Sequence, residues 1–173
     1  MQDYESQIKN ILDRLRSTGT KIPAVPCIYQ LKEPVFGTGS PQADIVSLED
    51  AIKAPLPQDF VAFQELCGTI SAMDIWNGYS IMGASHIKSL FADTQLLHVF
   101  HTDSQSIMMP IGSDGGGNMF LMGFVGGNQI LKWNHETDSQ EKLADSFTEF
   151  LERMLEDWEH FVIQDANWKY MSV

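Results

Sequence analysis

The stretch that decides how this chain folds is Pro110-Ile111-Gly112-Ser113-Asp114-Gly115-Gly116-Gly117-Asn118, followed by Met119-Phe120-Leu121-Met122-Gly123-Phe124. An apolar run ends in a glycine-rich turn, and a second apolar run leaves that turn. Glycine adopts positive φ without steric cost, and Asp and Asn side chains bond the local backbone in turns. The pattern therefore predicts two strands joined by a tight turn. Pro110 marks an edge or a bulge, because proline cannot donate to a strand ladder.

The same glycines invite comparison with a phosphate-binding loop, but they fail its requirements. Gly112 and Gly117 have P-loop spacing, yet Asn118 and Met119 stand where that loop needs Lys and Ser or Thr. A dinucleotide fingerprint needs a helix after the turn, whereas the pattern here predicts a strand. We therefore expect no nucleotide and no cofactor, and we interpret the turn as structural.

Composition and charge narrow the class of protein. The chain has 173 residues, of which 43% are hydrophobic and 20% charged, and its formal net charge is −12. Such a chain can bury a core, and its acidity opposes binding to nucleic acid while favouring a basic partner. Cys27 and Cys67 match no metal or redox spacing. Residues 1–5 lack the features of a secretory signal, and no apolar run approaches the ~20 residues that span a bilayer. We expect a cytoplasmic protein without membrane contact.

The first quarter of the chain differs from the rest. Residues 2–16 place apolar side chains on one helical face, and residues 20–44 are rich in Pro, Gly, Ser and Thr. Within that segment, residues 28–31 are a candidate short edge strand. We predict an N-terminal helix and connector over residues 1–44 and an α+β domain over residues 45–173.

The remaining pattern predicts alternating helices and hairpins. Ser47 is a candidate helix cap, and Leu56-Pro57-Gln58-Asp59-Phe60 opens a helix that Gly68 ends. Asn77-Gly78 and Gly126-Gly127 are hairpin turns. Helical periodicity covers residues 84–100, and strands are expected over residues 107–111, 119–125 and 129–133.

The last element has the clearest pattern. Ser146-Phe147-Thr148-Glu149 is a capping-box sequence that precedes an apolar helical stripe. The predicted fold class is α+β, with an antiparallel sheet of about four to six strands packed by helices at both ends of the chain.

A search for catalytic patterns finds none that is convincing. His98, His101 and Asp103 could share a helix end, but such a set is typical of ordinary polar residues rather than of a metal site. Cys67 lies on an apolar face, which would raise its pKa and leave it inert. No nucleophile elbow is present. We therefore expect a protein that is not an enzyme.

The candidate partner-binding residues lie around turns. Asp74, Trp76 and Tyr79 flank Asn77-Gly78, and Trp and Tyr bury large areas at low entropic cost when they contact a partner. Trp76 fits a core position equally well. Two acidic residues complete the candidate set: Asp114 in the glycine-rich turn, and Glu136 in the turn that follows the strand expected over residues 129–133.

These elements together resemble the SUKH superfamily over about residues 45–158. The residues that carry the resemblance are the Leu56–Phe60 helix start, the turn from Ile111 to Phe120, Trp133-Asn134-His135-Glu136 and the Ser146–Leu151 helix start. Cys67-Gly68-Thr69 departs from the family's usual Asn-Gly-Gly, and Asn118 stands where the family usually has an acidic residue.

The resemblance implies an α+β fold without enzymatic chemistry. Bacterial members resemble immunity proteins that bind and neutralise a toxin domain, frequently a nuclease, and fungal members are regulators of cell-wall and glucan assembly. For this acidic chain the resemblance favours an immunity protein with a basic toxin as its partner. A regulatory scaffold in cell-wall assembly is the alternative.

Overall fold

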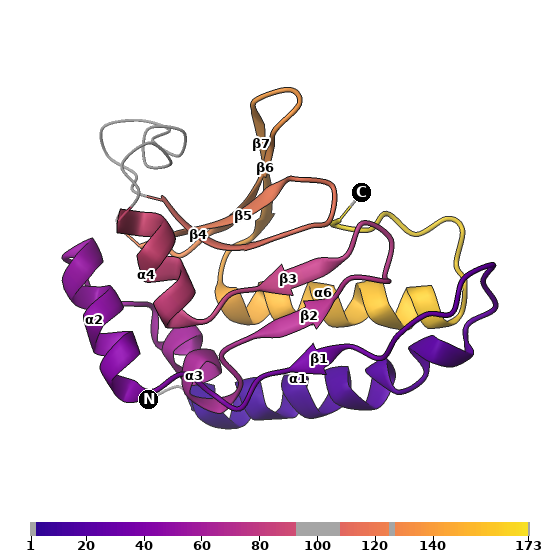
Figure 1. Ribbon diagram of the computed structural model, residues 1–173, viewed down its shortest axis with the longest axis horizontal. Coiled ribbons are helices and arrows are strands. Elements are labelled where there is room, and N and C mark those ends of the chain that lie inside the picture. The colour runs from indigo at the N-terminus through magenta and orange to yellow at the C-terminus, as the bar shows by residue number, and fades with distance from the viewer. Residues whose placement is uncertain (1–2, 93–107, 125–126, 173) are drawn as a thin grey trace.

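A seven-stranded antiparallel sheet forms the centre of the molecule (Figure 1). The computed structural model describes residues 3–92, 108–124 and 127–172. The strands lie in the sheet in the order of the sequence. They are β1 Val35–Phe36, β2 Ile70–Ala72, β3 Tyr79–Ile81, β4 Met108–Ser113, β5 Met119–Gly123, β6 Ile130–Asn134 and β7 Ser139–Ala144. The predicted α+β class is confirmed, with one strand more than the upper end of the predicted range.

The helices gather in two groups. They are α1 Tyr4–Gly19, the 3-10 helix η1 Ile22–Ala24, α2 Gln42–Ile52, α3 Gln58–Leu66, α4 Ala84–Ala92 and α6 Phe147–Val162. Helices α1, α3 and α6 pack together under the sheet, whereas α2 packs against α4 at one end of it (Figure 1). Among the described residues, no helix combines the length and the apolar character needed to cross a bilayer.

Helix α6 supplies the main packing stripe, as predicted. Its buried apolar side chains are Phe147, Phe150, Leu151, Met154, Leu155 and Trp158. The Ser146 hydroxyl oxygen accepts a hydrogen bond from the Glu149 N–H at 3.1 Å. The Glu149 carboxylate reaches back to the N–H of Asp145 at 2.7 Å, one residue before the usual capping-box partner.

Asp59, in the first turn of α3, has a partner on another helix. Its carboxylate is buried, and Oδ2 accepts hydrogen bonds from the N–H of Thr148 at 2.9 Å and from the Thr148 hydroxyl at 3.2 Å. The first N–H groups of a helix have no partner within the helix. Asp59 therefore satisfies the N-terminus of α6 from a helix far away in sequence.

Gln64 is a second buried polar residue that joins distant segments. Its Oε1 accepts hydrogen bonds from the Ala84 N–H at 2.9 Å and from the Ser40 hydroxyl at 2.7 Å. Its Nε2 donates to the carbonyl oxygen of Met82 at 3.0 Å. Because every polar atom of this amide has a partner, its burial fixes α3 against the segment between β1 and α2 and the segment after β3.

The strand predictions from the two apolar runs are confirmed. The ladder between β4 and β5 shifts register between Pro110 and Gly112, which is the bulge that Pro110 predicted. Strand β5 is buried on both faces: Phe120 and Met122 belong to the main core, and Leu121 packs with Met108 in a separate cluster.

Two local predictions are wrong. Helix α2 begins at Gln42 directly after Pro41, so Ser47 lies inside this helix instead of capping it. Residues 28–31 form no strand, and the edge strand is β1, in which Phe36 pairs with Ile70. Helix α4 begins as predicted, while residues 93–107, and with them the His98–Asp103 set, lie outside the described residues.

The N-terminal helix contributes to the same core as the sheet. Ile8, Ile11, Leu12 and Leu15 of α1 are buried in the cluster that also holds the α6 stripe. The division of the chain at residue 44 stays a prediction.

Candidate protein-binding surface

Three loops meet at one end of the sheet, and we call residues 73–78, 114–118 and 135–138 together the loop end. They connect β2 to β3, β4 to β5 and β6 to β7. The N–H of Gly115 donates to the carbonyl oxygen of Asn77, and the N–H of His135 donates to Asn118 Oδ1 at 3.2 Å. These hydrogen bonds join the middle loop to both of its neighbours, so that the three turns form one continuous surface.

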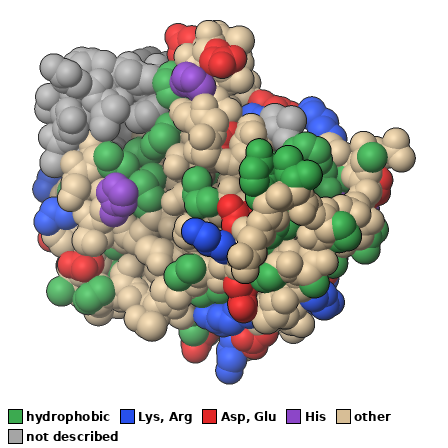
Figure 2. All heavy atoms as spheres, turned by 45° about the vertical axis from the view of Figure 1, so that its right-hand side comes forward, with side chains coloured by type: hydrophobic (Ala, Val, Ile, Leu, Met, Phe, Trp, Pro, Cys, Tyr) green, Lys and Arg blue, Asp and Glu red, His purple; other side chains and the backbone are tan. Residues whose placement is uncertain are grey.

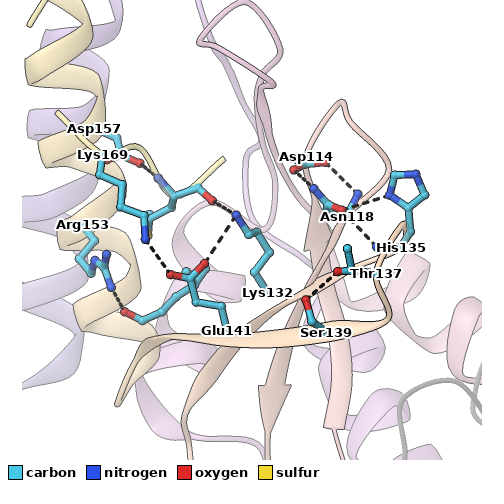
Figure 3. Close-up of polar contacts among 12 residues, drawn as sticks. Asp114, Asn118, Lys132, His135, Thr137, Ser139, Glu141, Arg153, Asp157 and Lys169 are labelled. Atoms are coloured by element: carbon cyan, nitrogen blue, oxygen red, sulfur yellow. Dashed lines mark hydrogen bonds and ion pairs between the residues drawn. The ribbon is translucent and has the colours of Figure 1, made fainter. Parts of the chain in front are cut away.

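The central turn is organised by the carboxylate of Asp114. Its Oδ1 accepts hydrogen bonds from the N–H groups of Gly116 and Asn118, each at 2.9 Å. Its Oδ2 accepts one from Asn118 Nδ2 at 2.8 Å, and Figure 3 shows the contacts between Asp114 and Asn118. The Asn118 amide in turn meets His135 Nδ1 at 3.1 Å. Asp114 therefore occupies N–H groups that a phosphate would need in a cradle, and the turn joins two strands, as predicted.

The C-terminal segment, residues 165–172, reaches the loop end along the sheet. The N–H of Met171 donates to Asp157 Oδ2 at 2.9 Å, and Lys132 Nζ donates to the Met171 carbonyl oxygen at 3.0 Å (Figure 3). Lys169 forms an ion pair with Glu141 at 3.3 Å. These contacts fix the segment between α6 and the strands β6 and β7.

Asp157 and Tyr79 form a buried polar pair under this segment. The Tyr79 hydroxyl donates to Asp157 Oδ2, and Trp168 Nε1 donates to Asp157 Oδ1 at 2.7 Å. Burial raises the pKa of the Asp157 carboxyl, although its hydrogen bonds oppose that rise. Burial, together with the adjacent Asp157 carboxylate, raises the pKa of the Tyr79 phenol well above its usual range. Both groups are structural, because neither reaches solvent.

The five candidate residues divide between interior and surface. Tyr79 is buried in the core and Asp114 inside its turn, so neither presents its side chain to a partner. The partner-binding role of the candidate set stays a prediction. Asp74 is half-buried and accepts a hydrogen bond from the N–H of Lys32 at 2.7 Å. Trp76 and Glu136 are exposed on separate turns of the loop end.

Trp76 has two unusual properties. Its side chain is 55% exposed, and its backbone has a φ of 50°, a left-handed conformation that is rare for a bulky residue. Its ring packs against Tyr170 with centroids 5.2 Å apart. Residues in sparsely populated backbone conformations cluster at functional sites, so Trp76 is a candidate contact residue.

A small apolar pocket, which we call the Trp76 pocket, opens beside this ring. Its volume is about 300 Å³, and its walls include Pro26, Trp76, Phe161, Asp165 and Tyr170. Hydrophobic side chains gather on this side of the molecule (Figure 2). Sequence reasoning identified only Trp76 of this set, because the other walls come from segments that carry no motif.

A wider hollow of about 750 Å³ lies where the N-termini of α3 and α6 meet. Four of the polar residues in its wall are hydrogen-bonded to one another, since Asp59 accepts from Thr148 and Ser146 accepts from Glu149. We therefore interpret the hollow as structural. In the part of the chain that the structure describes, no three His, Cys, Asp or Glu side chains are grouped as metal ligands. Burial raises the pKa of the Cys67 thiol, as expected from its apolar setting.

Comparison with known protein families gives one match. The model of the SMI1/KNR4 family (SUKH-1) matches residues 39–153, a range that includes strands β2 to β7, helix α3 and the first half of helix α6. A search of curated proteins found none that matches this chain.

Proposed function

We propose that this chain, which belongs to the SMI1/KNR4 family (SUKH-1), is a non-enzymatic module that binds another protein. The observation that carries the proposal is Trp76, a large aromatic side chain held exposed at the loop end on a left-handed backbone. Exposed Trp beside an apolar pocket is the chemistry of an interface anchor, because its contact buries much area with little loss of conformational entropy.

The polar groups around the loop end support binding rather than catalysis. Asp114, Asn118 and His135 hydrogen-bond one another within the turns, and the Asp157–Tyr79 pair is closed to solvent. A catalytic acid or base needs a free path to a substrate proton. The acids Asp114 and Asp157 hold loops and the C-terminal segment in place instead.

We infer further that the module is an immunity protein and that its partner is a basic toxin domain. The formal net charge of −12 steers basic proteins toward this chain and repels acidic ones. A nuclease toxin has to be basic to bind its polyanionic substrate, so the two charges are complementary.

Co-expression tests the proposal. Each toxin domain encoded beside this chain is expressed with it, and survival and co-purification are measured. We expect one pair to survive and to co-purify. Trp76→Asp should abolish co-purification, whereas Val46→Asp should not, because Val46 is also exposed but lies on α2. Failure with every adjacent toxin would contradict the immunity role.

The alternative, a regulatory scaffold in cell-wall or glucan assembly, makes a different prediction. A strain that lacks the chain would then show a weakened envelope in the absence of any toxin. Normal resistance of that strain to osmotic and detergent stress would count against the scaffold role.

A further inference from the structure

We propose that the Trp76 pocket is a binding site for one arginine side chain of the partner protein. The inference rests on the proposed function, because a basic partner is what would supply the arginine. It adds the site and the chemical group that the site recognises.

The aromatic walls provide a π-face for a cation. The rings of Trp76 and Tyr170 are inclined at 47° with centroids 5.2 Å apart, so they form an open angle rather than a closed stack. Trp76 remains half-exposed in this arrangement, and Phe161 and Pro26 complete the apolar wall. A guanidinium within about 6 Å of an indole face is attracted by the ring quadrupole, and Trp is the best partner for this interaction.

Asp165 adds a negative charge to an otherwise apolar lining. Its Oδ1 accepts a hydrogen bond from the Asn167 N–H at 3.0 Å, and its Oδ2 lies 3.0 Å from His160 Nδ1. The Asn167 N–H lowers the pKa of this carboxyl below its usual value, so Asp165 is ionised at neutral pH. Each carboxylate oxygen can accept a second hydrogen bond, which leaves capacity for an incoming donor.

The size and charge of the site favour arginine over other occupants. A volume of about 300 Å³ is at the lower limit for small-molecule pockets and suits a single side chain. The flat, weakly hydrated guanidinium stacks on aromatic rings better than the compact ammonium of lysine does, and its methylene stem suits Pro26 and Phe161. A second copy of this chain is disfavoured, since both copies would carry a charge of −12.

Peptide titration followed by NMR tests the site on the full chain. The probes are acetylated, amidated Gly-X-Gly peptides in which X is arginine, lysine, citrulline or norleucine. Citrulline keeps the shape of arginine without its charge, and norleucine is apolar only. We expect the arginine peptide to shift the Trp76 indole N–H and the Ala166 amide saturably at millimolar concentrations. Citrulline and norleucine should bind about fivefold more weakly or not at all, since a cation–π contact of ~1 kcal/mol corresponds to that factor.

Matched variants locate the effect. Trp76→Leu should abolish the arginine response and Trp76→Phe should retain part of it, because only Phe keeps a π-face. Trp133→Leu makes the same change on β6, outside the pocket, and should leave the response unchanged. Equal binding of norleucine and arginine, or no shift with arginine, would overturn the proposal. The comparison between the arginine and norleucine peptides uses the wild-type chain alone, so it remains decisive if a variant fails to fold.

The outcomes separate this inference from the proposed function. If a toxin binds the wild-type chain and the Trp76→Leu variant equally, the arginine site is wrong and the immunity role stands. If the arginine peptide binds at Trp76 while no adjacent toxin binds, the site stands and the immunity role is wrong.

Discussion

Replacing Asp114 with alanine should lower the free energy of unfolding by about 3 kcal/mol. This is the summed cost of leaving two buried hydrogen-bond donors without a partner. The Asp114 carboxylate accepts three hydrogen bonds, two of them from the backbone and side-chain amides of Asn118. Asn118 is only 8% exposed, so water cannot replace the lost acceptor. A buried donor without a partner costs about 1–3 kcal/mol. The third donor, the N–H of Gly116, belongs to an exposed residue and can bond water instead.

The measurement is urea unfolding followed by circular dichroism at 222 nm, with the free energy extrapolated to water. The slope m should stay unchanged, because the substitution does not change the surface exposed on unfolding. Asp114→Asn keeps the shape but turns one oxygen into a donor facing Asn118 Nδ2, so it should cost about half as much. Glu136→Ala removes an exposed acid from the neighbouring turn and is the control, with an expected change within about 0.5 kcal/mol.

The reasoning would be refuted if Asp114→Ala and Glu136→Ala unfolded at the same urea concentration with equal m. That result would mean that the turn holds its shape through its glycines and strand pairing alone, without the carboxylate.

Three further predictions concern other parts of the molecule. Replacing residues 115–117 by alanines should lower the melting temperature by several degrees, because Gly117 has a φ of 94° and a Cβ there would lie 3.1 Å from the His135 ring; a melting curve like that of the wild type would refute this. Gln64→Met should cost about 2 kcal/mol in urea unfolding, because the Met82 carbonyl oxygen loses its partner and the Ala84 N–H keeps only its longer hydrogen bond to the Ser40 hydroxyl at 3.3 Å. The raised pKa of Asp157 means that the folded state binds its proton more tightly than the unfolded state does, so this group's contribution to stability should fall as pH rises above about 4. The difference in unfolding free energy between the wild type and Asp157→Asn should therefore decrease from pH 4 to pH 7, and a constant difference would contradict the assignment.

Features encoded by neighbouring residues could be predicted from the sequence. Helix α6 was predicted because its capping residues and apolar stripe lie within a few turns of one another. The turn at Asp114 was predicted because glycine and aspartate have the required backbone chemistry wherever they occur. In both cases the local preference and the tertiary environment favour the same structure.

Features that depend on distant partners could not be predicted. Tyr79 was expected at the surface because it follows a turn, yet its hydroxyl pairs with Asp157 on α6 and the ring is buried. Strand β7 begins with four exposed residues, Ser139 to Lys142, whose side chains show no apolar alternation. The walls of the Trp76 pocket come from residues around 26 and 165, which no spacing rule connects.

The hydrogen bond from Thr148 to Asp59 has a consequence for how the molecule opens. The first turn of a helix normally frays, so its amide protons exchange with solvent quickly. Here the Thr148 amide proton is held by a carboxylate on α3, a helix that packs against both α1 and α6. That hydrogen bond has to break before the proton can exchange with solvent. The N-terminus of α6, ordinarily among the most labile points of a fold, should therefore exchange more slowly than the first turn of a helix without such a partner.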